Sequence, residues 1–275
     1  MPYGWPLKPF DRAHAVRGSF NDPRISGKSR AFHFGIDISG RDGTPVYAVA
    51  GGTVHLENEN AVSVDVWSVD FGYWHLVPAV RHRQRVERHQ LLGRILAPWG
   101  HVHLAERRNG EYVDPLRPGA LSPWSDPTSP RIAAIVFERS GRIVLPQRVA
   151  GDVDVVVEAY DRPPIAPPPP WDGAILTPAF IRWRVLRGRT VVRPWHTPID
   201  FRKGLLPPSR YAGVYAQGTR QNRPGKPGRY RFFVAHTWST RLLRDGSYRL
   251  EAEAVDERGN RARAGLSFRV ANAPV

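Results

Sequence analysis

Hydrophobic and polar positions alternate with a period of two along much of this chain. Six such runs lie in the second half, and each predicts a β-strand, because successive side chains of a strand point to opposite faces of a sheet. The predicted strands are residues 132–138, 153–160, 180–186, 229–234, 248–255 and 261–270. Periodic helical patterns are scarce, and the 27 prolines and 25 glycines favour short strands and turns. The pattern predicts an all-β protein.

The first half contains short alternating stretches whose polar face carries histidine. In residues 33–38, His33, Gly35 and Asp37 fall on one face, and the apolar positions between them fall on the other. An imidazole and a carboxylate on one face, separated only by a glycine, suit a small divalent metal. On its own this spacing is a weak signal, since such a pair is more often a surface ion pair.

Two further stretches strengthen the metal interpretation. Residues 101–104 place His101 and His103 on one face, and residues 73–76 alternate His75 against apolar neighbours. None of these stretches has the helical spacing of histidines in helix-borne zinc proteases. The chain therefore offers four histidines and one carboxylate on predicted strands. From the alternation alone, His101 and His103 are interchangeable as a third metal ligand.

The order of these residues resembles that of the lysostaphin-type zinc metallopeptidases, which cut peptidoglycan peptides. The shared pattern is His-x-x-x-Asp, then a lone His before Leu, then His-x-His. Three other segments fit it. Residues 43–54 are predicted as a hairpin with Gly51-Gly52 in its turn, residues 86–95 as the strand before the His-x-His, and residues 113–116 as the end of the domain. The resemblance covers about residues 18–116.

The resemblance implies both a fold and a site. The fold would be an antiparallel β-sheet peptidase core of the duplicated hybrid motif type. Zinc would be held by His33, Asp37 and His103 with a water in the fourth position, the arrangement of catalytic zinc sites. His75 and His101 would be the catalytic histidines, moving protons and stabilising developing charge. The sequence does not divide those roles between the two.

One segment departs from the family pattern. Related enzymes usually have a longer, Gly- and Ser-rich loop before the His-x-His strand, whereas residues 96–100 form a short connection that carries Pro98 and Trp99. A shorter loop removes one rim of a substrate cleft. The metal ligands are unaffected, so the departure leaves the substrate preference open.

The chain is long enough for two domains, and composition places the boundary near residue 127. Residues 118–130 are rich in Pro, Ser and Gly, as a linker should be. We expect a metallopeptidase domain at residues 1–127 and a basic β-sandwich at residues 128–275, interrupted by a proline-rich insertion at residues 161–170. Residues 246–260 resemble the final hairpin of an immunoglobulin-like sandwich, a weakly specific likeness that implies binding or spacing and no chemistry.

The net charge of +15 is uneven. Residues 1–127 carry 15 Lys+Arg against 13 Asp+Glu, a net charge of +2, and residues 128–275 carry 25 against 12, a net charge of +13. A strongly basic half attracts anionic polymers. We therefore expect peptidoglycan peptides as substrate and an anionic cell-envelope polymer as a partner of the second half. Nucleic acid is the less expected partner. Arginine that merely solubilises the surface remains the plain alternative.

The sequence says less about location. Cysteine is absent, which excludes disulfides and thiolate ligands, and no stretch is apolar enough to cross a membrane as a helix. Residues 1–20 lack the apolar run of a secretory signal peptide. The resemblance nevertheless implies a secreted or cell-envelope protein.

Three alternatives to a peptidoglycan peptidase remain at this point. The first is a non-catalytic scaffold of the same fold, against which the filled ligand set argues. The second is a protein whose main task is to bind an anionic polymer through its basic half. The third is a zinc peptidase that cuts some other peptide, which the altered loop at Pro98 and Trp99 leaves open.

Overall fold

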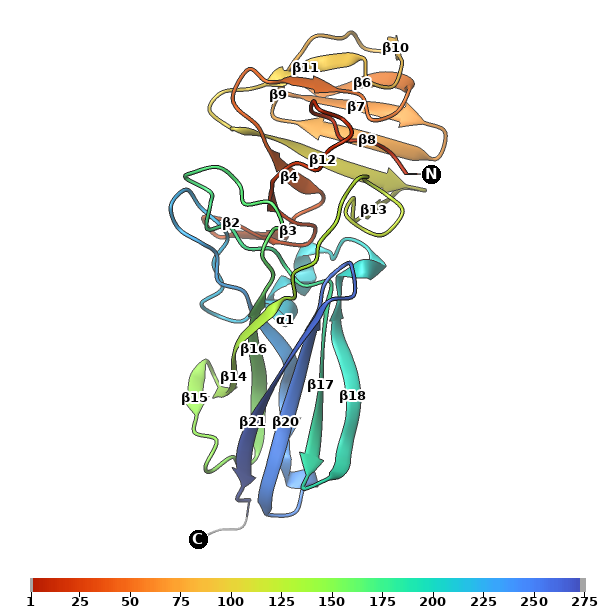
Figure 1. The fold of residues 1–275 in the computed structure, drawn as a ribbon. Coiled ribbons are helices and arrows are strands. Elements are labelled where there is room, and N and C mark those ends of the chain that lie inside the picture. The colour runs from red at the N-terminus through yellow and green to blue at the C-terminus, as the bar shows by residue number, and fades with distance from the viewer. Residues whose placement is uncertain (1, 273–275) are drawn as a thin grey trace.

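The computed structural model describes residues 2–272 of the chain, which form two β-rich units stacked end to end (Figure 1). The first unit contains β1 (Val16–Gly18), β2 (Pro23–Ser26), β3 (Ser29–Phe32), β4 (Ile36–Ser39), β5 (Pro45–Tyr47), β6 (Gly52–Asn58), β7 (Ala61–Val66), β8 (Val69–Trp74), β9 (Leu76–Pro78), β10 (Arg85–Val86), β11 (Leu91–Ile95), β12 (His101–Arg108) and β13 (Glu111–Val113).

The second unit contains β14 (Arg131–Arg139), β15 (Arg142–Val144), β16 (Asp152–Tyr160), β17 (Phe180–Arg187), β18 (Thr190–Asp200), β19 (Arg231–Ser239), β20 (Gly246–Val255) and β21 (Arg261–Val270). Its helical turns are η1 (Phe201–Lys203), η2 (Pro208–Arg210), α1 (Tyr211–Val214) and η3 (Thr240–Leu242). The all-β prediction is confirmed.

The first unit is built on one large antiparallel sheet in the order β1-β4-β12-β8-β7-β6-β10, with β13 paired to β12. A small sheet, β5-β11-β9, and the hairpin β2-β3 complete it. The side chains at 36, 38, 102 and 104 are fully buried, so the apolar faces of β4 and β12 point into one core. The histidines and the carboxylate of these segments are left on the opposite face, which is the face that carries the site.

The second unit is a sandwich of two four-stranded antiparallel sheets, β15-β14-β16-β19 and β18-β17-β20-β21. Both sheets contribute buried side chains to one core, which contains Phe137 and Phe232 from the first sheet and Trp183 and Leu250 from the second. The six strands expected here are present. β15 and β18 are additional, and β18 was missed because Pro194 and Pro198 interrupt its alternation.

Where the two units meet, each contributes a buried side chain to the core of the other. Leu176, which lies beyond the proline-rich insertion of the second unit, is buried in the core of the first. Phe32 at the end of β3 is buried in the core of the second, where its ring centroid lies 5.5 Å from that of Tyr211. The domain boundary near residue 127 therefore stays a prediction, and the hydrophobic cores on either side of it share residues.

Three local predictions about the first unit are wrong. Residues 43–54 do not form a hairpin, because β5 pairs with β11 and β6 pairs with β7. Gly51 and Gly52 are not left-handed turn residues. Instead, a Cβ at position 52 would lie 2.3 Å from the carbonyl oxygen of Asp65 on the neighbouring strand, so glycine is needed there for close approach of two backbones.

The stretch 33–38 is not one strand either. β3 ends at Phe32 and β4 begins at Ile36. His33 instead exchanges backbone hydrogen bonds with the preceding loop, donating its N–H to the carbonyl of Asp22 (3.0 Å) and accepting from the N–H of Asn21 (2.8 Å). His75 also lies outside the strands, between β8 and β9, with a positive φ of 66°.

Candidate metal centre and cleft

Three of the predicted site residues converge although only two of them lie on strands. β4 and β12 are paired so that Asp37 faces His103 directly, and His33 reaches the same point from the end of the β2-β3 hairpin. His33 Nε2 lies 2.7 Å from His103 Nδ1 and 3.1 Å from Asp37 Oδ1, and His103 Nδ1 lies 3.2 Å from Asp37 Oδ1. One ligand atom from each residue therefore faces a common centre, and no other residue joins this group among residues 2–272.

The protons on these rings leave room for a cation. His33 Nδ1 donates to the carbonyl of Ser19 (2.9 Å), so the neutral ring presents a bare Nε2 to the centre. A backbone acceptor on the outer nitrogen is the usual support of a metal-bound histidine. Donor atoms of a tetrahedral zinc site, at Zn–N distances of about 2.0 Å, lie about 3.3 Å from one another. The observed spacings are close to that, and two nitrogens and one oxygen suit zinc.

Burial sets the charge of the cluster. It lowers the pKa of His33, and it lowers that of His103 to about 3, so both rings are neutral and able to coordinate. Burial alone would raise the pKa of Asp37, but His33, Arg24 and His101 together hold it well below its usual value. The cluster is thus one carboxylate with two neutral imidazoles.

His101 lies next to this group on the same face of β12. Its Nε2 is 3.3 Å from Asp37 Oδ1. Its Nδ1 lies between a donor, Arg17 Nη2 at 2.5 Å, and an acceptor, the carbonyl of Trp99 at 2.8 Å. Either neutral tautomer therefore finds a partner at Nδ1, and Nε2 can act as a donor or as an acceptor. The group of mutually close ligand atoms contains His103 and not His101, which favours His103 as the third ligand.

His75 faces the cleft beside His101. Its ring stacks on Trp99 with centroids 3.9 Å apart, and it lies 4.5 Å from the ring of His101. Burial, and then the neighbouring His101, lower the pKa of His75 to about 3, so the ring is neutral near pH 7. The short connection at residues 97–100 thus brings an indole against the ring at position 75.

The cleft above the metal cluster has a volume of about 500 Å³ and is lined by both units. Its walls include Arg17 and Arg24 from the first unit and Trp171, Gln221 and Asn222 from the second. Arg24 Nη2 donates to Asp37 Oδ2 (2.6 Å), and the guanidinium of Arg17 lies 4.0 Å from the centre of the Trp171 ring. Asn222 Nδ2 donates to the carbonyl of Arg17 (3.2 Å).

Sequence reasoning named none of these five residues, although the family resemblance implies a wall of the site at the turn-rich loop of residues 18–24. Arg24 lies in that loop and Arg17 directly precedes it. Trp171 comes directly after a proline-rich insertion, and Gln221 and Asn222 lie in a Gly- and Arg-rich segment. Nothing local in those three marks them as neighbours of a site more than 65 residues away in the chain.

Comparisons with known proteins bear on the same segment. Residues 31–115 match the family model of Peptidase family M23. A search of curated protein sequences gives no match. Among solved structures, Csd3 of Helicobacter pylori is 19% identical, with a TM-score of 0.37, and the alignment covers 47% of this chain and 37% of that one.

Two other structures show a similar level of likeness. A zinc-containing peptidase from Vibrio cholerae is 22% identical with a TM-score of 0.35, over 42% of this chain and 39% of that one. The catalytic domain of the antimicrobial peptidase lysostaphin from Staphylococcus simulans is 21% identical with a TM-score of 0.32, over 35% of this chain and 86% of that one. The chain therefore spans well under half the length of Csd3 and of the Vibrio cholerae peptidase.

The family match brackets the cluster described above. It begins two residues before His33 and ends after β13, so it contains all five predicted site residues and excludes the second unit. Residues 31–115 of this chain are an M23 peptidase domain.

Proposed function

We propose that this protein is a zinc metalloendopeptidase that hydrolyses peptide bonds in peptidoglycan. The observation that carries the proposal is the convergence of His33 Nε2, Asp37 Oδ1 and His103 Nδ1 within about 3 Å of one another. Three such ligands with one open position are what a catalytic zinc site requires. Asp37 lines, together with His75 and His101, a cleft large enough for part of a peptide.

Zinc held by these residues would polarise the scissile carbonyl and lower the pKa of a water to about 7. His101 and His75 are placed to do the rest. His101 Nε2 accepts or donates a proton at the cleft, with Arg17 or the Trp99 carbonyl completing its tautomer at Nδ1. His75, neutral and stacked on Trp99, offers a second nitrogen to the developing oxyanion or to the leaving amine. The division of these two roles stays open.

The choice of peptidoglycan rests on the resemblance to lysostaphin-type enzymes, and it places the protein in the cell envelope or outside the cell. Within residues 2–272 no helix is long and apolar enough to cross a membrane. The short loop at Pro98 and Trp99 distinguishes this cleft from the pattern of the family, so the bond that is cut is best identified from products. A non-catalytic scaffold is the competing proposal.

Metal analysis combined with peptidoglycan digestion tests the proposal. We expect one zinc per chain, with soluble fragments whose masses identify the cleaved peptide bond. His33→Ala and His103→Ala should lose both zinc and activity, because each removes one of three ligands. His75→Ala and His101→Ala should keep zinc and lose about 10²–10⁴-fold in rate, the usual size of an acid–base contribution.

The matched control is His196→Ala, because this exposed histidine lies on β18 of the second unit. It should leave zinc content and rate unchanged. Stoichiometric zinc in purified His33→Ala would show that the ligand assignment is wrong. Loss of zinc from His101→Ala together with its retention in His103→Ala would exchange those two assignments. A zinc-loaded protein that releases no fragment from peptidoglycan would favour the scaffold or a zinc peptidase that cuts some other peptide.

A further inference from the structure

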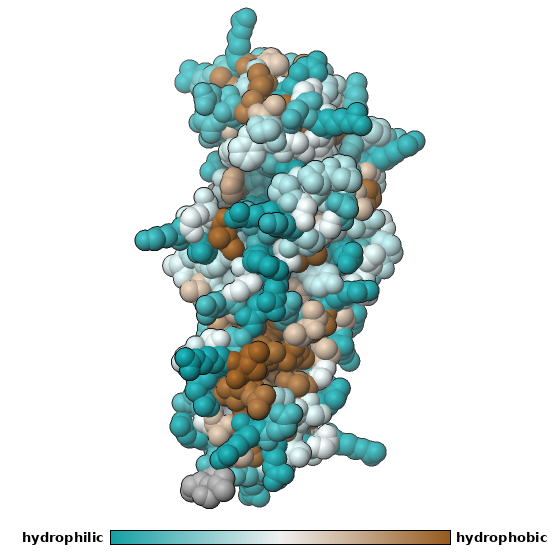
Figure 2. All heavy atoms as spheres, turned by 90° about the vertical axis from the view of Figure 1, so that its left-hand side faces the viewer, coloured by the Kyte–Doolittle hydropathy of each residue, from teal (hydrophilic) through white to brown (hydrophobic). Residues whose placement is uncertain are grey.

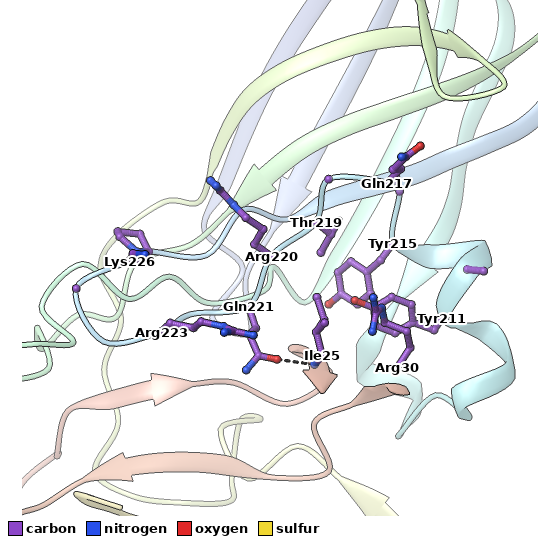
Figure 3. Close-up of a pocket in the computed structure, with 15 residues that line it drawn as sticks. Ile25, Arg30, Tyr211, Tyr215, Gln217, Thr219, Arg220, Gln221, Arg223 and Lys226 are labelled. Atoms are coloured by element: carbon purple, nitrogen blue, oxygen red, sulfur yellow. Dashed lines mark hydrogen bonds between the residues drawn. The ribbon is translucent and has the colours of Figure 1, made fainter. Parts of the chain in front are cut away.

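A second and larger hollow lies beside the metal cleft, where the two units meet (Figure 3). Its volume is about 770 Å³. Ile25 and Arg30 of the β2-β3 hairpin form one wall, and residues 211–227 of the second unit form the other. The rings of Tyr211 and Tyr215 lie at one end, beside Arg30, and the loop that carries Arg220, Arg223 and Lys226 lies at the other end.

This hollow, called here the basic pocket, has a one-sided charge. Its lining contains Arg30, Arg220, Arg223 and Lys226 and no Asp or Glu. These four side chains are exposed, and none forms an ion pair with a carboxylate of residues 2–272. Neighbouring arginines behave differently, since Arg229 and Arg231 pair with Glu158 and Glu138. The positive charge of the pocket is therefore left available to a ligand.

A buried hydroxyl at the tyrosine end of the pocket also lacks a partner. Tyr211 is 7% exposed, and its hydroxyl makes no hydrogen bond with residues 2–272. Burial raises the pKa of this tyrosine to about 12, so the hydroxyl keeps its proton and remains a donor. The adjacent Tyr215 hydroxyl donates to the carbonyl of Asn21 (2.7 Å). An unpaired buried donor is costly, and an acceptor group on a ligand would offset that cost.

The basic pocket adjoins the metal cleft. Gln221 lines both hollows, and its Oε1 accepts from the backbone N–H of Ile25 (2.5 Å). Neighbouring residues of β2 face opposite ways, so Arg24 reaches Asp37 in the metal cleft while Ile25 lines the basic pocket. A peptide held at the metal cluster and continuing past Gln221 would enter the basic pocket.

We infer that the basic pocket binds a carboxylate-bearing segment of the substrate peptide. The inference rests on the proposed peptidase function, because it takes the ligand to be a continuation of the peptide in the cleft. Four unpaired cations and an unpaired hydroxyl donor suit carboxylates, which accept several hydrogen bonds at once. The second unit thus selects substrates by charge, although it lies outside the M23 match.

The test measures binding separately from cleavage. Two fluorescent ten-residue peptides of alternating Ala and Gly carry three glutamates or three glutamines at one end, and a second pair carries them at the other end. Polarisation is measured with the full metal-free chain at low salt. We expect one glutamate peptide to bind at least tenfold more tightly than its glutamine twin, and the preference to shrink in 0.5 M salt because exposed charges are screened.

Variants locate the preference. The preference for the glutamate peptide should disappear in the triple variant Arg220→Ala/Arg223→Ala/Lys226→Ala. Tyr211→Phe, which keeps the ring, should weaken binding of the glutamate peptide several-fold and leave binding of the glutamine peptide unchanged. The matched control removes three exposed arginines outside the basic pocket. They are Arg189 in the turn between β17 and β18, Arg244 just before β20 and Arg269 near the end of β21. The control variant loses the same three positive charges as the pocket variant, and it should keep the preference for the glutamate peptide.

Equal binding of the two peptides in both pairs would overturn the inference, as would a preference that the pocket and control variants lose equally. Zinc-loaded protein is assayed in parallel for release of soluble fragments from peptidoglycan. Absence of fragments, with the glutamate preference intact, counts against the proposed reaction and leaves the basic pocket standing as a carboxylate site. Cleavage by a protein that shows no preference for the glutamate peptide supports the proposed reaction and counts against the basic pocket as a carboxylate site.

Discussion

At the scale of single residues, two glycines leave the space in which the metal ligands meet. A Cβ at position 18 would lie 2.7 Å from Asp37 Oδ2, and a Cβ at position 35 would lie 2.3 Å from the carbonyl oxygen of Leu104 and 2.8 Å from His103 Nε2. Carbon atoms do not approach other heavy atoms so closely without displacement. The glycine between the ligands in sequence is therefore needed for the path of the chain as well as for the open face of the cluster.

Gly35→Ala should disturb the metal cluster although it replaces none of the three ligands. Its methyl group meets the backbone of β12, which cannot swing aside as a side chain can, so β12 and His103 must shift. We expect zinc affinity to fall by about 10–100-fold, as when the support of a ligand is lost. Competition with a chelating dye measures the change. Gly213→Ala is the control, because a Cβ there meets no atom within 4 Å. Unchanged zinc affinity in Gly35→Ala would mean that the two strands can separate at no cost to the cluster.

At the scale of elements, the sequence reveals the strands better than their ends and partners. The alternation at residues 101–104 predicts a strand with two histidines on one face, and β12 has that form. The same reasoning fails at His33, because its backbone bonds to the loop at Asn21 and Asp22 and not to the large sheet. The ligand atoms still meet, because His33 lies near the start of β4 whether residues 33–38 form one strand, as predicted, or are divided, as observed. Alternation detects which face a side chain occupies, and it carries no information on long-range pairing.

The proline-rich insertion shows what the sequence could not supply. Read alone, residues 161–170 are predicted as an extended, solvated interruption. In the structure they form no regular strand, but Asp161 is buried and bridges to the backbone of Leu176. The residues directly after the insertion make the long-range contacts. Trp171 lies over Arg17, and Thr177 donates its backbone N–H to Ser19 Oγ (2.9 Å) next to the loop that supports His33. Contacts between residues about 150 apart depend on how the units pack, which no local pattern encodes.

Trp171→Ala should slow the reaction while zinc stays bound. The indole holds the guanidinium of Arg17, which in turn donates to the Trp99 carbonyl and to His101 Nδ1. A partly buried cation–π contact contributes about 0.5–2 kcal/mol, so we expect kcat to fall by about 2–30-fold. Trp67→Ala serves as the control, because Trp67 is 98% exposed and lies in the turn between β7 and β8. An unchanged kcat would show that Arg17 is held in place without the insertion.

At the scale of the whole molecule, the second unit has two faces of different character. Figure 2 shows hydrophobic side chains gathered over its lower half, on the side of β14 and β15 in Figure 1, where Ile143 and Leu145 are exposed. On the other sheet, Arg182 and Arg184 share a side of β17, but they pair with Glu253 and Glu251. That pairing reduces the charge that this strand offers to an anionic polymer. Such a partner for the basic half stays a prediction.

The junction of the units also holds a cluster of carboxylates that titrates as part of the fold. Oxygens of Asp126, Asp161 and Asp256 lie within 4.8 Å of one another. Burial, and then the charge of Asp126, raise the pKa of Asp161 to about 8 from an ordinary value of 3.8. Asp161 is only 4% exposed, which accounts for the large effect of burial. In the folded protein this group therefore keeps its proton at neutral pH, whereas in the unfolded chain it is ionised.

This difference fixes the sign of a pH dependence. Between about pH 4 and pH 8 the folded state binds one proton more than the unfolded state, so the free energy of unfolding falls as the pH rises through this window. Asp161→Asn removes the titration and keeps an oxygen to accept from the N–H of Arg162, a bond of 2.8 Å in the native chain. We expect native and Asp161→Asn proteins to melt together near pH 4. At pH 8 the variant should melt several degrees higher, since about 1 kcal/mol corresponds to about 2–4 °C in a chain of this size.

Thermal unfolding of the full chain at both pH values measures this difference. The control is Asp172→Asn at an exposed position, which should match the native protein at each pH. A variant that melts below the native protein at pH 8 would mean that the carboxylate at position 161 is ionised and held by a favourable partner, and the junction would then gain stability with rising pH.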